Sequence, residues 1–269
     1  MNIISSRLLD STGLVTCGVS TRSRGVSPEP FDMNMSFNVG DLKENVQRNR
    51  ELFVRALGMR VDQLAIPLQV HGAAVKRANT PGSYPECDGL VTDTPRVVLS
   101  VSIADCVPIC IVDTQRKAVA AIHAGWRGTL AGIVERGVQL LINEFQCTPE
   151  TMVAYIGPSA SACCYAVGED VAARFSHALI RQEGGRIFLD LKAANVAQLV
   201  AAGVPRDRIE VSPHCTIGEA DLLHSYRRDS EQSGRMMGVI SLKVLSCGVH
   251  LCPARGTDSQ VEAPPVTIR

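Results

Sequence analysis

The chain has 269 residues, and its 27 Lys and Arg residues balance its 27 Asp and Glu residues. Proteins dedicated to nucleic acids or membrane surfaces normally carry a basic excess, so the balanced charge argues against both classes. Aromatic residues make up only 4% of the chain, and its apolar runs are shorter than a membrane span. Residues 1–10 lack the basic start and apolar core of a secretory signal. We therefore expect a cytoplasmic globular protein that acts on a small molecule and keeps its ten cysteines as reduced thiols.

Short apolar segments and amphipathic segments follow one another along the chain. Strands are predicted at residues 14–21, 64–70, 97–103, 107–112, 118–122, 152–156, 209–211 and 237–242. Helices are predicted at residues 42–57, 130–145, 169–183 and 191–200, the last with Asp190 as its N-cap and Gly203 as its stop. Segments 31–41 and 78–86 have the composition of loops. No internal repeat or composition shift marks a domain boundary, so we expect one domain over residues 1–243 and a weakly structured tail over residues 244–269.

Residues 97–129 are the stretch around which the chain is organised. A polar turn at residues 113–116 separates two apolar runs, which predicts an antiparallel hairpin. If Thr114 and Gln115 are the central turn residues, Cys106 and His123 face each other, within one residue, at the open end of the hairpin. Backbone pairing would then bring a thiol and an imidazole together.

Three predicted strands end on a side chain that can bind a metal ion, namely His71, Cys106 and His123. Donors at strand ends gather at one edge of a sheet, and two His with one Cys can hold zinc while leaving a fourth position for water. A His or Cys at a strand end can equally be a hydrogen-bonded polar group or a small core residue. The spacing alone leaves both interpretations open.

The residues after His123 suggest an anion site. Gly125 and Gly128 permit close approach of the backbone, and Arg127 offers a fork of donors beside the start of a helix. Free backbone amides together with an Arg can bind phosphate or another anion. The alternative is that Arg127 forms an ordinary surface ion pair, and its position beside the candidate ligand favours the functional interpretation.

Nine segments, in one order, resemble the successive blocks of a known family. They are CGVSTRSRGVS, MNMSFNVGD, QVHG, CDGLVTD, ADCVPICIVD, AAIHAGWRGTLAGI, IGPSASACCYAVGEDV, LDLKAANVAQL and SYRRDSEQSGRM. The family is that of the multi-copper polyphenol oxidases (laccase-like), also described as YfiH-type purine nucleoside phosphorylases. The resemblance covers roughly residues 14–242, so it rests on much more than one motif.

The resemblance implies an α/β fold: a single-domain layered sandwich with mixed and antiparallel sheets. By match to the QVHG, ADC and HAGWRG blocks, it implies a zinc ion held by His71, Cys106 and His123. The implied activities are phosphorolysis of adenosine, inosine and 5′-methylthioadenosine, with adenosine deamination. The implied partners are purine nucleosides and phosphate, with no nucleic acid and no membrane, and we expect a monomer or weak homo-oligomer. Bacterial members of the family have also been linked to correcting peptidoglycan precursors.

Further residues are expected to serve this chemistry. Arg127, with Arg22, would position phosphate against the ribose carbon while the purine leaves. Asp88 and Asp105 are candidates for the general acid, and Cys163 and Cys164 would shape the pocket, a vicinal redox pair being the alternative. The residues expected to bind substrate are Arg22, Asn34, Asp88, Asp105 and Cys164.

The sequence departs from the family pattern in two places, and it favours zinc over copper. Ile103 stands where the family often has Thr before Ala-Asp-Cys, and Asn34-Met35-Ser36 replaces the usual Asn-Leu-Gly. Both departures lie beside the expected site and bear on substrate preference. A multicopper oxidase needs a histidine-rich cluster, whereas this chain has six His in all, so copper is the less favoured metal. The Cys247-x-x-His250-x-Cys252 cluster in the tail resembles a zinc motif in composition, and we interpret this resemblance as coincidental.

Two other classes of function remain open. A metal-free cysteine hydrolase or deamidase, or an enzyme that edits peptidoglycan precursors, would use Cys106 as nucleophile and His123 as base, with Arg127 or backbone amides as oxyanion donors. The family's fold is similar to that of the cytotoxic necrotizing factor toxins, which use such a pair. His71 discriminates between the classes, because a Cys–His dyad does not require a second His. A non-catalytic scaffold would be marked by the loss of a ligand, and all three are present.

Overall fold

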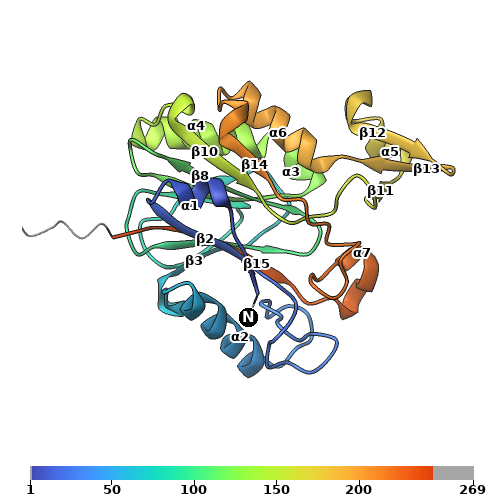
Figure 1. The fold of residues 1–269 in the computed structure, drawn as a ribbon, viewed down its shortest axis with the longest axis horizontal. Helices are drawn as coiled ribbons and strands as arrows, with labels where there is room; N and C mark the ends of the chain where they lie inside the picture. Colours follow the sequence, from blue (N-terminus) through green and yellow to red (C-terminus); the bar gives the residue numbers. More distant parts are fainter. Residues whose placement is uncertain (1, 245–269) are drawn as a thin grey trace, which may run out of the picture.

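Two six-stranded sheets lie face to face and carry helices on their outer sides (Figure 1). This arrangement confirms the predicted layered α/β sandwich with mixed sheets. The computed structural model describes residues 2–244. The predicted tail and its Cys247–His250–Cys252 cluster therefore lie outside the described residues.

The first sheet joins strands from both halves of the chain. Its order is β1 (Ile3–Ile4), β2 (Val15–Ser20), β15 (Met236–Leu242), β7 (Val98–Ile103), β3 (Leu64–Pro67) and β5 (Gly82–Tyr84). The strands β2, β15 and β7 pair antiparallel, whereas β3 pairs parallel with both β7 and β5. This sheet is therefore mixed.

The second sheet contains the predicted hairpin at its centre. Its order is β14 (Ile209–Val211), β10 (Met152–Ile156), β8 (Val107–Asp113), β9 (Val119–Ala124), β6 (Gly89–Thr92) and β4 (Val75–Arg77). A smaller sheet has the order β11 (Ala166–Val167), β13 (Arg186–Leu189) and β12 (Ile180–Glu183). In the second sheet β8, β9 and β6 pair antiparallel, so the segments that precede β8 and β6 lie beside the end of β9.

Helices complete the layers. The α-helices are α1 (Arg7–Ser11), α2 (Lys43–Ala56), α3 (Trp126–Leu130), α4 (Ile133–Phe145), α5 (Glu169–Ala172), α6 (Leu191–Ala201) and α7 (Tyr226–Asp229). The short 3-10 helices are η1 (Val61–Gln63), η2 (Pro149–Thr151), η3 (His177–Leu179), η4 (Arg206–Arg208) and η5 (Ser230–Gln232). Among the described residues, none of these helices has the length and apolar character needed to cross a bilayer.

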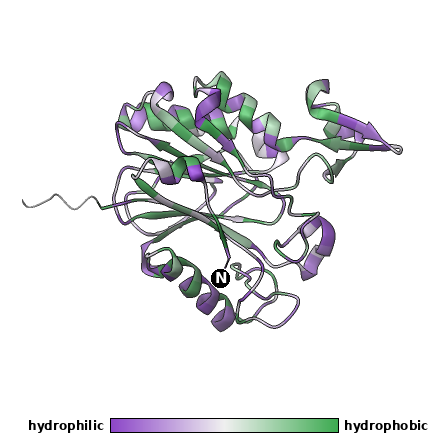
Figure 2. Cartoon of the chain, viewed as in Figure 1, coloured by the Kyte–Doolittle hydropathy of each residue, from purple (hydrophilic) through white to green (hydrophobic). Residues whose placement is uncertain are grey.

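Alternate side chains of the central strands serve two different cores. On β8, Ile109 and Ile111 pack in the core that includes residues of α4 and α6, whereas Cys110 and Val112 pack between the two sheets. This is the period of two that a strand imposes. A third core joins α2 to the outer face of the first sheet. Hydrophobic residues accordingly dominate the strands, and hydrophilic residues line the outer sides of the helices (Figure 2).

The hairpin forms as predicted, but its register differs. Pro108 pairs with His123 and Val107 with Ala124, so Cys106 precedes the strand and is not the direct partner of His123. The turn is centred one residue later than expected, because Asp113 pairs with Ala118 across a loop in which Lys117 has a positive φ of 55°. The resulting shift is two positions, and a shift of two keeps a side chain on the same face of the sheet. The register was predicted wrongly, but the thiol of Cys106 and the imidazole of His123 still lie in one site, as expected.

The predicted helix at residues 169–183 is wrong. Only α5 and η3 are helical there, and β12 pairs with β13 across Gly184 and Gly185, whose φ values are +57° and +72°. Two adjacent residues with positive φ form a tight hairpin turn, which glycines favour strongly. Smaller corrections concern three other segments: the predicted strand 64–70 ends at Pro67, the loop 78–86 contains β5, and the helix 130–145 is divided into α3 and α4 at Gly132.

Candidate metal centre

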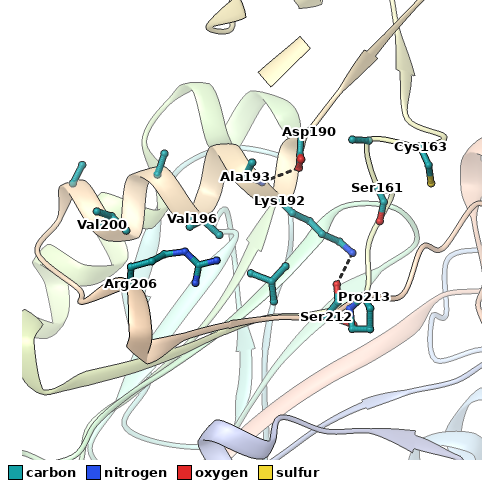
Figure 3. A pocket seen from close by; sticks show the side chains of 14 residues that line it. Ser161, Cys163, Asp190, Lys192, Ala193, Val196, Val200, Arg206, Ser212 and Pro213 are labelled. Atoms are coloured by element: carbon teal, nitrogen blue, oxygen red, sulfur yellow. Dashed lines mark hydrogen bonds between the residues drawn. The ribbon is translucent and has the colours of Figure 1, made fainter. Parts of the chain in front are cut away.

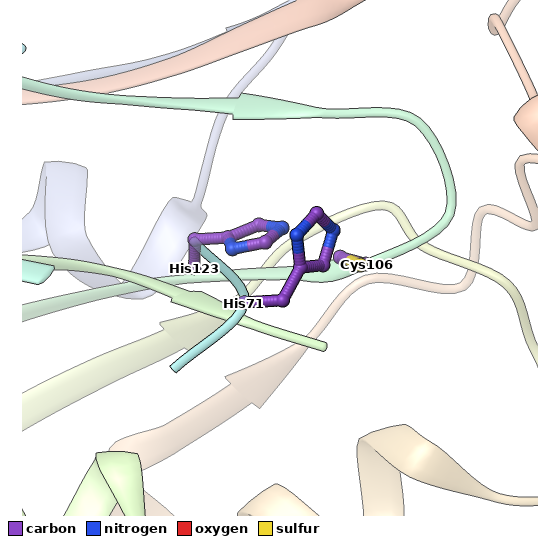
Figure 4. A group of neighbouring side chains, drawn as sticks. All are labelled: His71, Cys106 and His123. Atoms are coloured by element: carbon purple, nitrogen blue, oxygen red, sulfur yellow. The ribbon is translucent and has the colours of Figure 1, made fainter. Parts of the chain in front are cut away.

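The structure brings His71, Cys106 and His123 together. Their nearest ligand atoms all lie within 4.8 Å of one another, and the two imidazole rings are 5.0 Å apart between centroids at an interplanar angle of 81°. Figure 4 shows both rings and the thiol pointing toward a common centre. His123 is on β9, Cys106 lies immediately before β8, and His71 lies in the loop between β3 and β4. The three residues differ in exposure: His123 is buried, Cys106 is partly buried and His71 is exposed.

Asp88 fixes the positions of both histidines. The register of β6 and β9 places Asp88 opposite His123, whose backbone N–H donates to the Asp88 carbonyl at 2.7 Å. The Asp88 carboxylate lies 2.9 Å from His123 Nδ1 and accepts backbone N–H groups from Val70, His71 and Gly72 at 3.1, 2.9 and 2.8 Å. A carboxylate on Nδ1 keeps the proton there and leaves Nε2 as the metal-binding atom. The sequence indicated Asp88 as a substrate-binding residue or an acid, and in the structure its oxygens hold the ligand loop.

The loop that carries His71 has an unusual backbone conformation. His71 has a φ of +57°, which non-glycine residues seldom adopt, and the three N–H groups bound to Asp88 hold it there. A Cβ on Gly128 would lie 2.6 Å from the carbonyl oxygen of Gly72, and a Cβ on Gly125 would lie 3.1 Å from the Cys106 sulfur. Both glycines therefore permit the close approach that the sequence pattern suggested.

The charges of the site favour a thiolate. Burial raises the pKa of the Cys106 thiol, but the neighbouring His123, with hydrogen bonds from His123 and His71, outweighs it and lowers the pKa to about 6. Burial lowers the pKa of His123, but Cys106 and Asp88 stabilise its charged form and raise the pKa to about 9. The thiolate is the form of cysteine that binds metals and acts as a nucleophile.

Asp105 holds the loop before Cys106. It is buried, has a φ of +91°, and uses both carboxylate oxygens: one accepts the Thr216 hydroxyl and the other the Arg227 backbone N–H, each at 2.7 Å. Its backbone carbonyl accepts the N–H of Ala160 at 2.9 Å. No sequence pattern connected Thr216 and Arg227 with Asp105, because residues more than a hundred positions away meet Asp105 only in the folded chain.

The arginines expected to bind phosphate have different surroundings. Arg127 is exposed, stacks over Trp126 at 4.2 Å and, within residues 2–244, forms no ion pair. Arg174, for which no sequence pattern indicated a role, lies over the same ring at 5.8 Å. Arg22 instead pairs with Glu29 at 2.9 Å. The ring of Trp126, three residues after His123, thus carries two guanidinium groups.

Asn34 and Cys164 are engaged elsewhere. The Asn34 amide is buried and hydrogen-bonds to Ser36, Asp41 and the backbone of Arg235, so it holds the 33–41 loop against the 233–235 segment. Cys164 contacts Cys163, with 3.0 Å between the two sulfur atoms. A cavity of about 860 Å³ lies beside α6 and is lined by Cys163, Lys192 and other residues, but by none of the three candidate ligands (Figure 3).

Known proteins resemble this chain over most of its length. Residues 16–243 match the family model described as multi-copper polyphenol oxidoreductase laccase. A Deinococcus radiodurans protein named purine nucleoside phosphorylase is 41% identical over 230 residues, which are 83% of this chain and 87% of the relative. The Geobacillus stearothermophilus protein named purine nucleoside phosphorylase YlmD is 36% identical over 242 residues, covering 83% of this chain and 88% of the relative.

Solved structures share the same fold. The crystal structure of YlmD from Geobacillus stearothermophilus superposes with a TM-score of 0.82 at 35% identity, covering 86% of this chain and 92% of that chain. The Bacillus licheniformis hypothetical protein YfiH gives a TM-score of 0.79 at 32% identity, covering 85% and 93% of the two chains. The match of residues 16–243 and these similarities show that the chain belongs to the multi-copper polyphenol oxidoreductase laccase family.

Proposed function

We propose that this protein is a zinc-dependent purine nucleoside phosphorylase that acts on adenosine, inosine and 5′-methylthioadenosine and also deaminates adenosine. The observation that carries the proposal is the convergence of His71, Cys106 and His123, with Asp88 on the Nδ1 of His123. The names of the relatives from Deinococcus radiodurans and Geobacillus stearothermophilus support the purine nucleoside phosphorylase part of the proposal.

The donor set fits zinc in number and in chemistry. Two imidazoles and a thiolate are ligands that zinc accepts, and three protein ligands leave one position open. The Gly125 position has no side chain, and a Cβ there would come within 3.1 Å of the Cys106 sulfur and 3.4 Å of His71 Cδ2. The exposed side of His71 would be the route by which substrate reaches the centre. Copper is the alternative metal, and metal analysis of the purified protein separates the two.

In this proposal the residues of the chain bind the metal ion and the phosphate, and they orient the metal ligands. A zinc ion held by the three ligands would supply a Lewis acid to the bound purine nucleoside. Arg127, with Arg174 on the same indole ring, would bind the phosphate that attacks the ribose carbon, because neither guanidinium pairs with a carboxylate of residues 2–244 and each can bind the phosphate bidentately. Asp88 and Asp105 would act as positioning residues. Arg22, Asn34 and Cys164 would contribute to the substrate wall only through the segments that they hold.

The test compares adenosine turnover with and without phosphate. Phosphorolysis converts adenosine and phosphate to adenine and ribose 1-phosphate, whereas deamination converts adenosine and water to inosine and ammonia, so chromatography distinguishes the reactions. We expect about one zinc per chain, and we expect chelation or His71→Ala to abolish both activities. His177→Ala is the matched control, because His177 is an exposed histidine in η3, and it should retain both metal and activity. Full adenosine turnover by metal-free protein would refute the proposal.

The second candidate is a metal-free cysteine hydrolase or deamidase, including an enzyme that edits peptidoglycan precursors. The nearness of the Cys106 sulfur to the His123 ring favours it, since a nucleophile and its base must lie together. The same samples decide between the two. A metal-free chain in which Cys106 is alkylated rapidly, and in which His71→Ala keeps its activity, would support the dyad and reject the zinc enzyme.

A further inference from the structure

A second group of sulfur atoms lies outside the candidate metal centre. The side chains of Cys163, Cys164 and Cys215 place their sulfur atoms within 4.8 Å of one another. The Cys163 sulfur lies 3.0 Å from that of Cys164 and 3.7 Å from that of Cys215. The three residues form neither a compact motif nor a disulfide, and the proposed phosphorylase chemistry uses none of the three thiols.

The backbone around these cysteines is held from several sides. Ser159 and Cys215 form a parallel bridge, and the N–H of Thr216 donates to the Ser159 carbonyl at 3.1 Å. The N–H of Cys164 donates to Ser161 at 2.9 Å, and the N–H of Cys215 donates to the Glu219 carboxylate at 2.7 Å. Two segments far apart in the sequence are therefore fixed relative to each other, as a metal site with little reorganisation requires.

We propose that Cys163, Cys164 and Cys215 form a second metal site, a three-thiolate site for a thiophilic cation such as Zn²⁺ or Cu⁺. Thiolate ligands select these ions. A Zn–S bond of about 2.3 Å places tetrahedral sulfur ligands roughly 3.8 Å apart. The Cys163–Cys215 distance of 3.7 Å already has this value, and the Cys163–Cys164 contact of 3.0 Å must lengthen by less than an ångström. Each thiol that binds the ion loses its proton to the solvent.

The surroundings favour negative charge on Cys215, whereas the hydrogen bond with Cys163, burial and the neighbouring Cys215 raise the pKa of Cys164 to about 12. Burial raises the pKa of Cys215, but hydrogen bonds from the backbone amides of Ser161, Gly218 and Ile217 outweigh it, and its pKa lies below the ordinary value for a thiol. Lys192 is a buried cation that donates to the carbonyls of Ser212 and His214 at 2.9 and 2.7 Å. Its ammonium lies in the cavity that Cys163 also lines (Figure 3).

The exposure of the three sulfurs leaves one side of the site open. Cys215 is buried, Cys164 is partly buried and Cys163 is exposed at the rim of the cavity, so an ion has a route from solvent. A fourth ligand would come from this side. The alternative chemistry is a disulfide, which uses only two of the three sulfurs. Convergence of three sulfurs therefore favours a metal ion over a disulfide.

The test uses Cd²⁺, whose bonds to thiolates produce a charge-transfer absorption in the near ultraviolet. The full-length chain would carry Cys106→Ser, which removes the sulfur ligand of the first centre, together with Cys247→Ser and Cys252→Ser. In this background we expect one Cd²⁺ per chain with thiolate absorption. Adding Cys163→Ser should weaken binding at least about 100-fold. Adding Cys147→Ser, which removes a buried thiol elsewhere, should leave the affinity unchanged.

Three results would overturn the inference. They are binding of Cd²⁺ that is equal with and without Cys163→Ser, no thiolate absorption in the background chain, and reduced protein that binds no Cd²⁺ but loses two titratable thiols on exposure to peroxide. The last result would indicate a disulfide in place of a metal site. Cys164→Ser provides a second variant at a partly exposed position, and circular dichroism verifies that each variant is folded. None of these readouts depends on nucleoside turnover, so failure here is distinct from failure of the proposed function.

Discussion

Replacing Asp88 by Asn should lower both the stability of the protein and its affinity for the metal ion, although the substitution only exchanges one oxygen atom for an NH₂ group. The buried carboxylate lies within hydrogen-bond distance of His123 Nδ1 and accepts hydrogen bonds from the backbone N–H groups of Val70, His71 and Gly72. An Asn amide has one oxygen, so in either orientation its NH₂ group faces donors. With the NH₂ toward Val70 and Gly72, two N–H groups in partly buried hydrogen bonds lose their acceptor, which costs about 1–3 kcal/mol each where water does not replace it. We expect the free energy of unfolding to fall by roughly 2–6 kcal/mol.

The effect on the metal ion is separate from the effect on stability. If the Asn NH₂ instead faces His123, it donates to Nδ1 and favours the tautomer with its proton on Nε2, the atom that must bind the ion. Loss of such an outer carboxylate typically weakens metal binding about 10–100-fold. This corresponds to roughly 1.4–2.8 kcal/mol at 25 °C.

Asp113→Asn is the matched control for Asp88→Asn. Asp113 is equally buried and accepts four hydrogen bonds of 2.7–3.0 Å, but it ends β8 at the opposite end from Cys106. Thermal unfolding would measure stability, and competition with a chromophoric chelator would measure zinc affinity. We expect both variants to lose stability and only Asp88→Asn to lose affinity. Equal zinc affinity in Asp88→Asn and the unmodified protein would refute the assignment of Asp88 as the residue that orients His123.

Three further predictions concern the scaffold. Burial raises the pKa of Asp113, but the hydrogen bonds that its carboxylate accepts outweigh burial and hold the pKa below the ordinary value near 3.9. The ionised carboxylate therefore stabilises the fold above that pH, and this stabilisation is lost as the pH falls through the folded-state pKa. Chemical unfolding at a series of pH values should show the cost of Asp113→Asn shrinking below about pH 4. Gly128→Ala places a Cβ 2.6 Å from the Gly72 carbonyl oxygen, and the strain should cost about 1–3 kcal/mol in urea unfolding despite the better helix propensity of Ala. Asp190→Ala removes the side-chain bond to the N–H of Ala193 and should lower the unfolding free energy by about 1 kcal/mol, a result that an unchanged denaturation midpoint would contradict.

The hairpin could be predicted from the sequence because it depends on a local pattern, whereas His71 joins Cys106 and His123 from a loop between strands of different sheets, and only the family resemblance assigned the full ligand set. The apolar runs on either side of residues 113–116 specify two strands, and their ends carry Cys106 and His123. The register was wrong by two because it depends on the detail of the turn. Asp113 accepts the backbone N–H groups of Gln115 and Arg116, and this side-chain geometry moves the centre of the turn.

Other features depend on contacts that no local pattern shows. Asp88 meets His123 only because β6 pairs with β9, and the composition around Asp88 does not specify that pairing. Cys163 and Cys215, 52 positions apart, meet beside the parallel pair β10 and β14. The helix predicted at residues 169–183 failed for a local reason that could have been found, since Gly184-Gly185 is a strong hairpin signal.

The place of β15 in the first sheet has a consequence for how the chain is made. β15 is the last strand among the described residues, yet it pairs with β2 and β7 at the interior of the sheet. During synthesis the second sheet has all its strands once residue 211 has emerged from the ribosome, whereas β2 and β7 have no common partner until residues 236–242 follow. The nascent chain therefore exposes two unpaired apolar strand edges for this interval, and protection of those edges would govern the yield of folded protein.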